Sequence, residues 1–138
     1  MTETKRLLAL DVGERRIGVA RADTIARIAS PLTTLTVDGT EVVALQRLML
    51  ENDITELVVG LPRNMSGEPT KQTEAVRQFV ERRLSGFEMP IHYQDESLTS
   101  VTAEQELERR KKPYSKSDVD SLAATYILQD YMEANYGF

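Results

Sequence analysis

The first part of the chain carries the apolar pattern of β-strands. Residues 7–12 form a nearly unbroken apolar run, and residues 17–20 follow after a glycine-containing turn, which together predict a β-hairpin. Residues 25–37 are rich in Thr, Ile and Leu and predict a third strand. Pro31 places this strand at a sheet edge because proline cannot donate a ladder hydrogen bond. The apolar run at 57–60 is typical of a central parallel strand that is buried on both faces.

Beyond the third strand, the pattern alternates between amphipathic helices and short strands. Apolar residues recur at three- and four-residue spacing, as a helix with one buried face requires, before and after a proline- and glycine-containing loop at 61–70. The predicted helices cover residues 40–51, 71–84, 99–110 and 117–134, and a last strand covers residues 90–94. This order predicts an α/β fold in which a mixed sheet is flanked by helices on both faces.

Length and composition limit the class of chemistry. A chain of 138 residues predicts one domain covering residues 1–138, and a net charge of −5 excludes a uniformly basic surface but allows a local basic patch. The absence of cysteine excludes disulfides, thiolate metal sites and a cysteine nucleophile. His92 is the only histidine and lies inside a predicted strand, so a structural role fits it better than a catalytic triad. Carboxylates therefore remain as the main candidates for chemistry.

The N-terminal segment predicts a protein of the cytoplasm. Its apolar run covers only residues 7–10, far shorter than a signal-sequence core or the roughly 20 residues that cross a bilayer. The absence of cysteine agrees with a reducing compartment.

Three carboxylates occupy positions where a sheet protein places a site. Asp11 ends a predicted strand and Glu96 follows another, and ligands of α/β sheets gather at strand ends. Asp120 continues the apolar face of the last helix, whereas Asp118 points to nearly the opposite side. That face consists of Val119, Ala123, Ile127, Tyr131 and Ala134. Two simpler interpretations stay open: Asp11 as a turn residue before Gly13, and Asp120 as a partner of the helix dipole.

These carboxylates favour a metal-dependent active site. If they converge, mutual repulsion raises their pKa values unless divalent cations bind between them. Oxygen ligands select Mg²⁺ or Mn²⁺ rather than zinc. Such ions serve phosphodiester hydrolysis by activating water and stabilising the leaving oxygen. The candidate catalytic and metal-binding residues are therefore Asp11, Glu96 and Asp120.

Basic residues near these segments supply candidate phosphate contacts. Arg16 lies in the first turn, Arg63 in the long loop, and Lys111 and Lys112 in a basic run before the last helix. Together they form a candidate nucleic-acid-binding surface on an acidic protein. For each residue taken singly, ordinary solvated surface is the alternative interpretation.

Four segments are specific when they are taken together. In chain order they are LALDVGERRIGVA, ELVVGLPRNMSGE, YQDESLTSVTAE and VDSLAATYIL, and the likeness runs through nearly all of the chain. The sequence resembles the YqgF family, also called RuvX, within the ribonuclease H-like superfamily. The resemblance implies a five-stranded mixed sheet flanked by helices. It also implies an acidic site that binds Mg²⁺ or Mn²⁺ and that falls on Asp11, Glu96 and Asp120.

The acidic motifs depart from the family pattern in two ways. The family often has Asp-Glu-Arg where this chain has Asp95, Glu96 and Ser97, which removes a phosphate contact beside the site. Asp118 is an additional acid near Asp120 and a further candidate metal ligand. The helix-face argument keeps Asp120 first.

The resemblance also implies a function. It points to a metal-dependent nuclease that processes the 5′ end of pre-16S rRNA during ribosome biogenesis. In that function Arg16, Arg63, Asn64, Lys111 and Lys112 would position the strand. A Holliday junction resolvase or DNA nuclease of recombination and repair is one alternative, and symmetric junction cutting would require a homodimer. A non-catalytic RNA-binding assembly factor is another, and an ATP-binding protein of the actin and sugar-kinase type would need a second lobe.

Overall fold

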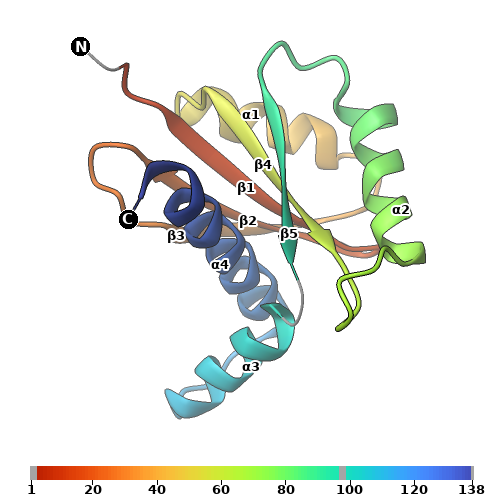
Figure 1. The fold of residues 1–138 in the computed structure, drawn as a ribbon, viewed down its shortest axis with the longest axis vertical. Coiled ribbons are helices and arrows are strands. Elements are labelled where there is room, and N and C mark those ends of the chain that lie inside the picture. Colours follow the sequence, from red (N-terminus) through yellow and green to blue (C-terminus); the bar gives the residue numbers. More distant parts are fainter. Residues whose placement is uncertain (1–2, 97–98, 138) are drawn as a thin grey trace.

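The computed structural model describes residues 3–96 and 99–137, and its strands form one mixed sheet (Figure 1). The strands are β1 (Arg6–Val12), β2 (Arg16–Asp23), β3 (Ser30–Thr36), β4 (Glu56–Pro62) and β5 (Ile91–Glu96), in the spatial order β3-β2-β1-β4-β5. β1 pairs antiparallel with β2, and β2 with β3, whereas β4 runs parallel to β1 and to β5. The predicted hairpin, the edge position of the strand with Pro31 and the interior parallel strand are confirmed.

Helices cover both faces of this sheet. They are α1 (Glu41–Glu51), α2 (Lys71–Phe79), which continues into the short π-helix η1 (Val80–Leu84), α3 (Thr99–Arg109) and α4 (Lys116–Tyr136). α1 and α2 pack on one face, and α4 crosses the other with α3 against it (Figure 1). This arrangement confirms the predicted α/β fold class. Among the described residues, no helix combines the length and the apolar character needed to span a membrane.

The inner strands are buried on both faces because their side chains alternate between two apolar cores. Leu8 and Leu10 of β1 contact the side covered by α1 and α2, whereas Leu7 and Ala9 face α4. All four are fully buried, and each leucine side chain contributes roughly 1.5–3 kcal/mol by burial. The same alternation directs Asp11, at the end of the strand, toward α4.

Two glycines let α4 approach the sheet closely. A Cβ atom on Gly18 of β2 would lie 2.0 Å from the carbonyl oxygen of Asp120, and a Cβ on Gly60 of β4 would lie 2.5 Å from Cδ1 of Ile127. Both distances are too short for atoms in van der Waals contact. A larger residue at position 18 would meet the backbone of α4 and displace the helix, whereas at position 60 the side chain of Ile127 would have to move. The start of α4 is thereby fixed over the hairpin of β1 and β2.

The predicted start of the third strand is wrong. The strand begins at Ser30 rather than at residue 25. The side chain of Asp23 accepts hydrogen bonds from the backbone amides of Ile25 and Ala26, at 2.8 and 2.6 Å, and this local bonding forms a turn in place of a ladder.

The last helix is longer than predicted and is buried over a wider surface. It begins at Lys116 because Ser115 caps it, and it ends before Gly137, whose φ is 74°. Leu122 is buried together with the predicted apolar face because α4 packs against α3 as well as the sheet. Ala134, expected on the buried face, is exposed, whereas Tyr136 two residues further on packs against the core beneath α4.

Candidate active site

The acidic ends of two strands lie at one edge of the sheet. β1, β4 and β5 are parallel, so their carboxyl ends point the same way, toward the loop between β4 and α2 (Figure 1). Asp11 and Glu96 lie at these ends. Both line a hollow of about 260 Å³ between the strand ends and the start of α3, together with Arg63. The structure thus brings together two of the acids identified in the sequence.

Asp120 reaches Asp11 from the start of α4. Asp11 pairs across the hairpin with Gly18, and the backbone of Asp120 lies directly over Gly18. The two carboxylates are therefore close enough to repel each other. Burial, and secondarily the charge of Asp120, raise the pKa of Asp11 to about 6.

The carboxylate of Asp120 is held by Arg16, a residue expected to contact substrate. Nε of Arg16 donates to Oδ2 of Asp120 at 2.5 Å, and both side chains are partly exposed. The guanidinium of Arg16 thus neutralises the charge of Asp120, which in the metal hypothesis binds the metal cation instead. Arg16 and a metal ion would compete for Asp120.

Glu96 has the least favourable surroundings of the three acids. Burial raises its pKa most, followed by a hydrogen bond with the side chain of Asp130 and by the charges of Asp130, Asp11 and Asp95, to a value of about 8. Within the part of the chain that the structure describes, the buried Oε1 atom of Glu96 has no hydrogen-bond partner. Without a cation, Glu96 therefore holds a proton near neutral pH.

Two residues of this site are absent from the sequence prediction. Asp130 contacts Glu96 from α4. It lies one turn beyond Ile127, whose side chain lies over Gly60 of β4, and this helical spacing is the signal that could have identified it. Gln72 lines the hollow from the first turn of α2, and the sequence pattern contains no signal for it.

The loop after β4 carries Arg63 into the hollow. Nε of Arg63 lies 3.1 Å from Oδ1 of Asp95, and its backbone amide donates to the carbonyl of Glu96 at 2.9 Å, so the loop is bound to the end of β5. Asn64 stabilises the loop itself, because its side-chain oxygen accepts from two loop amides at 3.0 and 2.9 Å. Arg63 therefore lies beside the acids, whereas the Asn64 oxygen holds the loop.

Asp118 and the two lysines lie in other surroundings. Asp118 is exposed and completes the cap of α4, because its Oδ2 accepts from the Ser115 amide at 2.9 Å. With Lys112 it lines a separate hollow of about 230 Å³. Lys111 is exposed in the turn between α3 and α4, at a φ of 56°. Ser97, where the chain departs from the family pattern, lies outside the described residues.

The chemistry of the donor set fits a hard divalent cation. Asp11, Glu96 and Asp120 offer carboxylate oxygens, which Mg²⁺ and Mn²⁺ prefer, and one buried oxygen of Glu96 lacks a partner among residues 3–96 and 99–137. In the positions of the described side chains, no group of three acidic or histidine residues is arranged to hold an ion. Binding by all three acids therefore requires side-chain movement.

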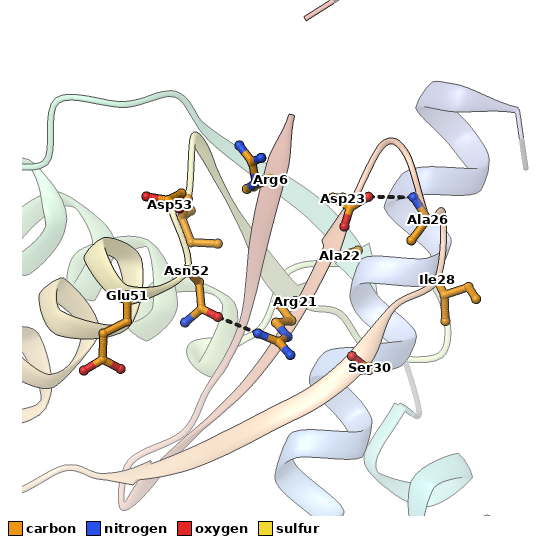
Figure 2. A pocket seen from close by; sticks show the side chains of 11 residues that line it. Arg6, Arg21, Ala22, Asp23, Ala26, Ile28, Ser30, Glu51, Asn52 and Asp53 are labelled. Carbon is orange, nitrogen blue, oxygen red and sulfur yellow. Dashed lines mark hydrogen bonds between the residues drawn. The ribbon is translucent and has the colours of Figure 1, made fainter. Parts of the chain in front are cut away.

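A different hollow, of about 510 Å³, lies at the opposite end of the sheet (Figure 2). Arg21 reaches from β2 and donates to Oδ1 of Asn52, at the end of α1, at 2.6 Å. Asp23, which also lines this hollow, is used by the turn after β2. These side chains hold neighbouring elements together, so the hollow is assigned a structural role.

His92 also has structural contacts. Its Nε2 atom lies 3.2 Å from Oε2 of Glu56 on the neighbouring strand. Its ring stacks on Tyr131 of α4 with the ring centroids 5.4 Å apart. Both contacts agree with the structural role expected for this histidine.

The fold belongs to the ribonuclease H-like class. It is similar to the structure titled "T. thermophilus RuvC in complex with Holliday junction substrate", with a TM-score of 0.55 and 12% sequence identity over 96% of each chain. At this level of identity the similarity establishes the fold alone. The predicted architecture, a five-stranded mixed sheet between helices, is that of this class.

The chain belongs to the RuvX family. Residues 5–134 match the family described as "RuvX: Holliday junction resolvase". Relatives named "Putative pre-16S rRNA nuclease" include proteins from three organisms. The one from Chloroflexus aurantiacus is 46% identical over 132 residues, which is 93% of this chain and 86% of the relative. Those from Crocosphaera subtropica and Moorella thermoacetica are 44% and 41% identical, and the matches cover 91% and 93% of this chain and 91% and 94% of the relatives. The predicted family is confirmed, and the predicted nuclease function agrees with these names.

Proposed function

We propose that this protein is a divalent-metal-dependent nuclease that hydrolyses phosphodiester bonds in structured RNA, at the 5′ end of the 16S rRNA precursor. The observation that carries the proposal is the repulsion of Asp11 by Asp120 and of Glu96 by Asp11, between acids from three distant segments at one sheet edge. Carboxylates with a purely structural role are normally paired, whereas the buried Oε1 of Glu96 has no hydrogen-bond partner among the described residues. The names of the relatives support ribosomal RNA as the substrate.

Asp11, Glu96 and Asp120 are the residues that would hold Mg²⁺ or Mn²⁺, with Asp118 as a more distant candidate. When bound, such an ion neutralises charge on the phosphate and lowers the pKa of water. Glu96 carries a proton near neutral pH and would release it on becoming a ligand, so metal binding would be coupled to proton release. Asp120 would exchange part of its pairing with Arg16 for the ion.

Basic side chains position the substrate strand in this proposal. Arg63 lies in the same hollow as the acids, and its partner Asp95 is 67% exposed, so a phosphate can replace that weak ion pair. Arg16, once released from Asp120, is available to a neighbouring phosphate. Lys111 and Lys112 extend the contact along the turn between α3 and α4, and Asn64 supports the loop that carries Arg63.

The proposal also defines where the protein acts and on what. The precursor of 16S rRNA is made and assembled with ribosomal proteins in the cytoplasm of bacteria. The expected partner is therefore a ribosomal precursor particle in that compartment.

Holliday junction resolution is a second candidate function. The description of the matching family favours it. Symmetric cleavage of a four-way junction requires two active sites, so this function would need a homodimer.

A non-catalytic RNA-binding role in ribosome assembly is the third candidate. The observation in its favour is that the described side chains contain no ready group of three metal ligands. In this case the basic residues would act without the acids.

The deciding experiment compares three labelled substrates: an RNA with the 5′ leader of 16S rRNA, single-stranded DNA and a four-way DNA junction. Each is incubated with Mg²⁺, Mn²⁺ or a chelator. We expect metal-dependent cleavage of the RNA and none with the chelator. Preferred cleavage of the junction would support the resolvase, and tight RNA binding without cleavage would support the assembly factor.

The Asp11→Asn variant assigns the activity to this site. We expect cleavage to fall by at least about 10²-fold, the scale of losing one group that stabilises a transition state, while the circular dichroism spectrum is retained. Asp53→Asn is the matched control, because Asp53 is an exposed acid after α1 with a φ of 50°, a conformation that asparagine tolerates. Unchanged cleavage by Asp11→Asn would refute the assignment.

A further inference from the structure

An apolar hollow of about 620 Å³ lies between the end of β1 and α2. Val12 and Val76 are buried and Phe79 is half-buried, and with the exposed Ala75 they form its apolar lining. Glu14 and Lys71 also line the hollow. The hollow therefore combines an apolar wall with charged groups of both signs.

This hollow adjoins the candidate active site at one residue. Gln72 lines both it and the hollow that contains Asp11, Glu96 and Arg63. Val12 follows Asp11 in β1 and faces the α2 side of the sheet, whereas Asp11 faces the α4 side, so the two hollows meet past the end of β1. A single strand bound at the acids reaches the apolar hollow by passing around this strand end beside Gln72.

The wall between the two hollows is well anchored. α2 starts with a capping box, in which the side chains of Thr70 and Thr73 each accept from the other residue's backbone amide. The buried hydroxyl of Thr73 also donates to the carbonyl of Pro62, at the end of β4. Gln72 is thereby held next to the strand end, so the two hollows keep a constant relation to each other.

We propose that the apolar hollow is a subsite for one nucleobase of the substrate strand, next to the phosphate that is cleaved. The inference rests on the proposed nuclease function. A polynucleotide alternates anionic phosphates with flat, largely apolar bases, and the two adjoining hollows present the matching sequence of groups. Arg63 and Lys71 suit phosphates, while the wall with Phe79 suits the face of a base.

The polar groups at the hollow suit the edge of the same base. Gln72 offers an amide donor and acceptor, and Glu14 offers acceptors for an exocyclic amino group. A base can enter the hollow only when it is unstacked from its neighbours. The subsite therefore selects single-stranded or locally opened nucleic acid over continuous duplex.

Ala75→Trp is the substitution that tests the subsite, because Ala75 is exposed on α2 and a large side chain there fills the hollow without disturbing the core. Ala134→Trp makes the same change at an exposed helical alanine of α4 and serves as the control. Ala75→Leu is a second variant with a smaller side chain. Melting temperatures of the three variants establish that each is folded.

The measurement is fluorescence anisotropy with short single-stranded RNA, with Ca²⁺ in place of Mg²⁺ or Mn²⁺ so that the strand stays intact. A second RNA has the same backbone with abasic sites throughout. We expect Ala75→Trp to weaken binding of the intact RNA by about tenfold, the scale of one stacked base, and Ala75→Leu to weaken it less. The abasic RNA is expected to bind equally to Ala75→Trp and the unmodified protein.

Two results with Ala75→Trp would overturn the subsite. The first is that Ala75→Trp and Ala134→Trp bind the intact RNA equally, and the second is that Ala75→Trp loses the same affinity for the intact and the abasic strand. If the unmodified protein cleaves RNA with Mn²⁺ in these cases, the proposed function stands and the subsite alone is wrong. If the unmodified protein neither binds nor cleaves RNA, both are wrong.

Discussion

Glu41 and Glu96 are two sheltered glutamates with opposite surroundings. Glu41, at the start of α1, is 1% exposed, and its Oε2 accepts from the amides of Asp38 and Gly39 at 3.2 and 2.7 Å. Its Oε1 lies 3.3 Å from Nη1 of Arg83. Backbone hydrogen bonds above all, helped by Arg83, lower the pKa of Glu41, whereas the pKa of Glu96 is raised to about 8.

The difference shows that burial alone does not mark a functional carboxylate. Burying a carboxylate costs free energy unless hydrogen bonds or a cation compensate it. Glu41 has this compensation within the chain and links the start of α1 to η1. Glu96 faces other acids, so its ionised form requires a cation from outside the chain. The hydrogen-bond donors around a carboxylate, and the charge of its neighbours, therefore distinguish the structural Glu41 from Glu96 of the candidate site.

The largest expected difference between the two glutamates is in the RNA cleavage rate of their glutamine variants. Glu96→Gln removes a carboxylate from the candidate metal site, and we expect metal-dependent RNA cleavage to fall by at least about 10²-fold. Glu41→Gln should keep the activity per folded molecule, because Glu41 lies outside the site. Comparable losses in both folded variants would contradict the comparison.

The stability of the same two variants should change in opposite directions. Glu41→Gln removes the charge that two backbone amides and Arg83 require, and we expect it to lower the free energy of unfolding by about 1–3 kcal/mol. Glu96→Gln should leave the metal-free protein as stable or more stable near pH 8. Urea unfolding monitored by circular dichroism measures both. A destabilised Glu96→Gln protein at this pH would show that Glu96 is a structural acid.

The pH dependence of stability provides a smaller test. The pKa of Glu96 is about 8 in the folded chain and near 4.5 in the unfolded chain, so the folded state binds more protons between these values. Unfolding then releases a proton, and the contribution of Glu96 to stability falls as the pH rises from about 4.5 to 8. Asp11 acts in the same direction between 3.8 and about 6.

We therefore expect the melting temperature of the metal-free protein to decrease by a few degrees from pH 6 to pH 8, and to decrease less in Glu96→Gln. Mn²⁺ should restore stability more at pH 8 than at pH 6, because fewer protons remain to be displaced. Parallel melting curves for the two proteins across this range would contradict the assignment. Glu41 does not interfere, because its lowered pKa places its effect at acidic pH.

The smallest expected effect concerns Arg16. Arg16 forms an ion pair with the carboxylate of Asp120, which competes with metal binding. Arg16→Gln should therefore tighten Mn²⁺ binding by about 2–5-fold, the scale of a partly exposed ion pair. Titration calorimetry without nucleic acid isolates this effect from any contact of Arg16 with substrate. Arg15→Gln, a change in the neighbouring exposed arginine, is the control. Weaker binding by Arg16→Gln would show that Arg16 supports the metal site instead.

Most of the architecture follows from local patterns in the sequence. The apolar runs at 7–12 and 57–60 become β1 and β4, and the edge position of β3 follows from the missing amide of Pro31. The start of β3 could not be predicted in this way, because the side chain of Asp23 forms a turn where the composition favours a strand. Local hydrogen bonds decided this boundary.

The candidate site was only partly accessible from the sequence. Helix geometry separates Asp120 from Asp118, and the structure places Asp120 next to Asp11 while Asp118 completes the cap of α4. Asp130 lies one turn beyond Ile127, a spacing that could have marked it, whereas Gln72 lies on a helix whose rotation relative to the sheet is set by packing, so sequence spacing does not reveal it. The pairing of Arg16 with Asp120 joins residues 104 positions apart, beyond the reach of any local rule.

The sequence by itself determined the order of strands and helices, the acidic character of the chemistry and the family, because each depends on residue type and on spacing within a few residues. The tertiary structure alone decided which carboxylates are compensated and which repel one another. The opposite pKa shifts of Glu41 and Glu96 arise from the groups that the folded chain brings against them. Electrostatic free energy depends on distances in space, and these exist only once α4 is packed over Gly18 and Gly60.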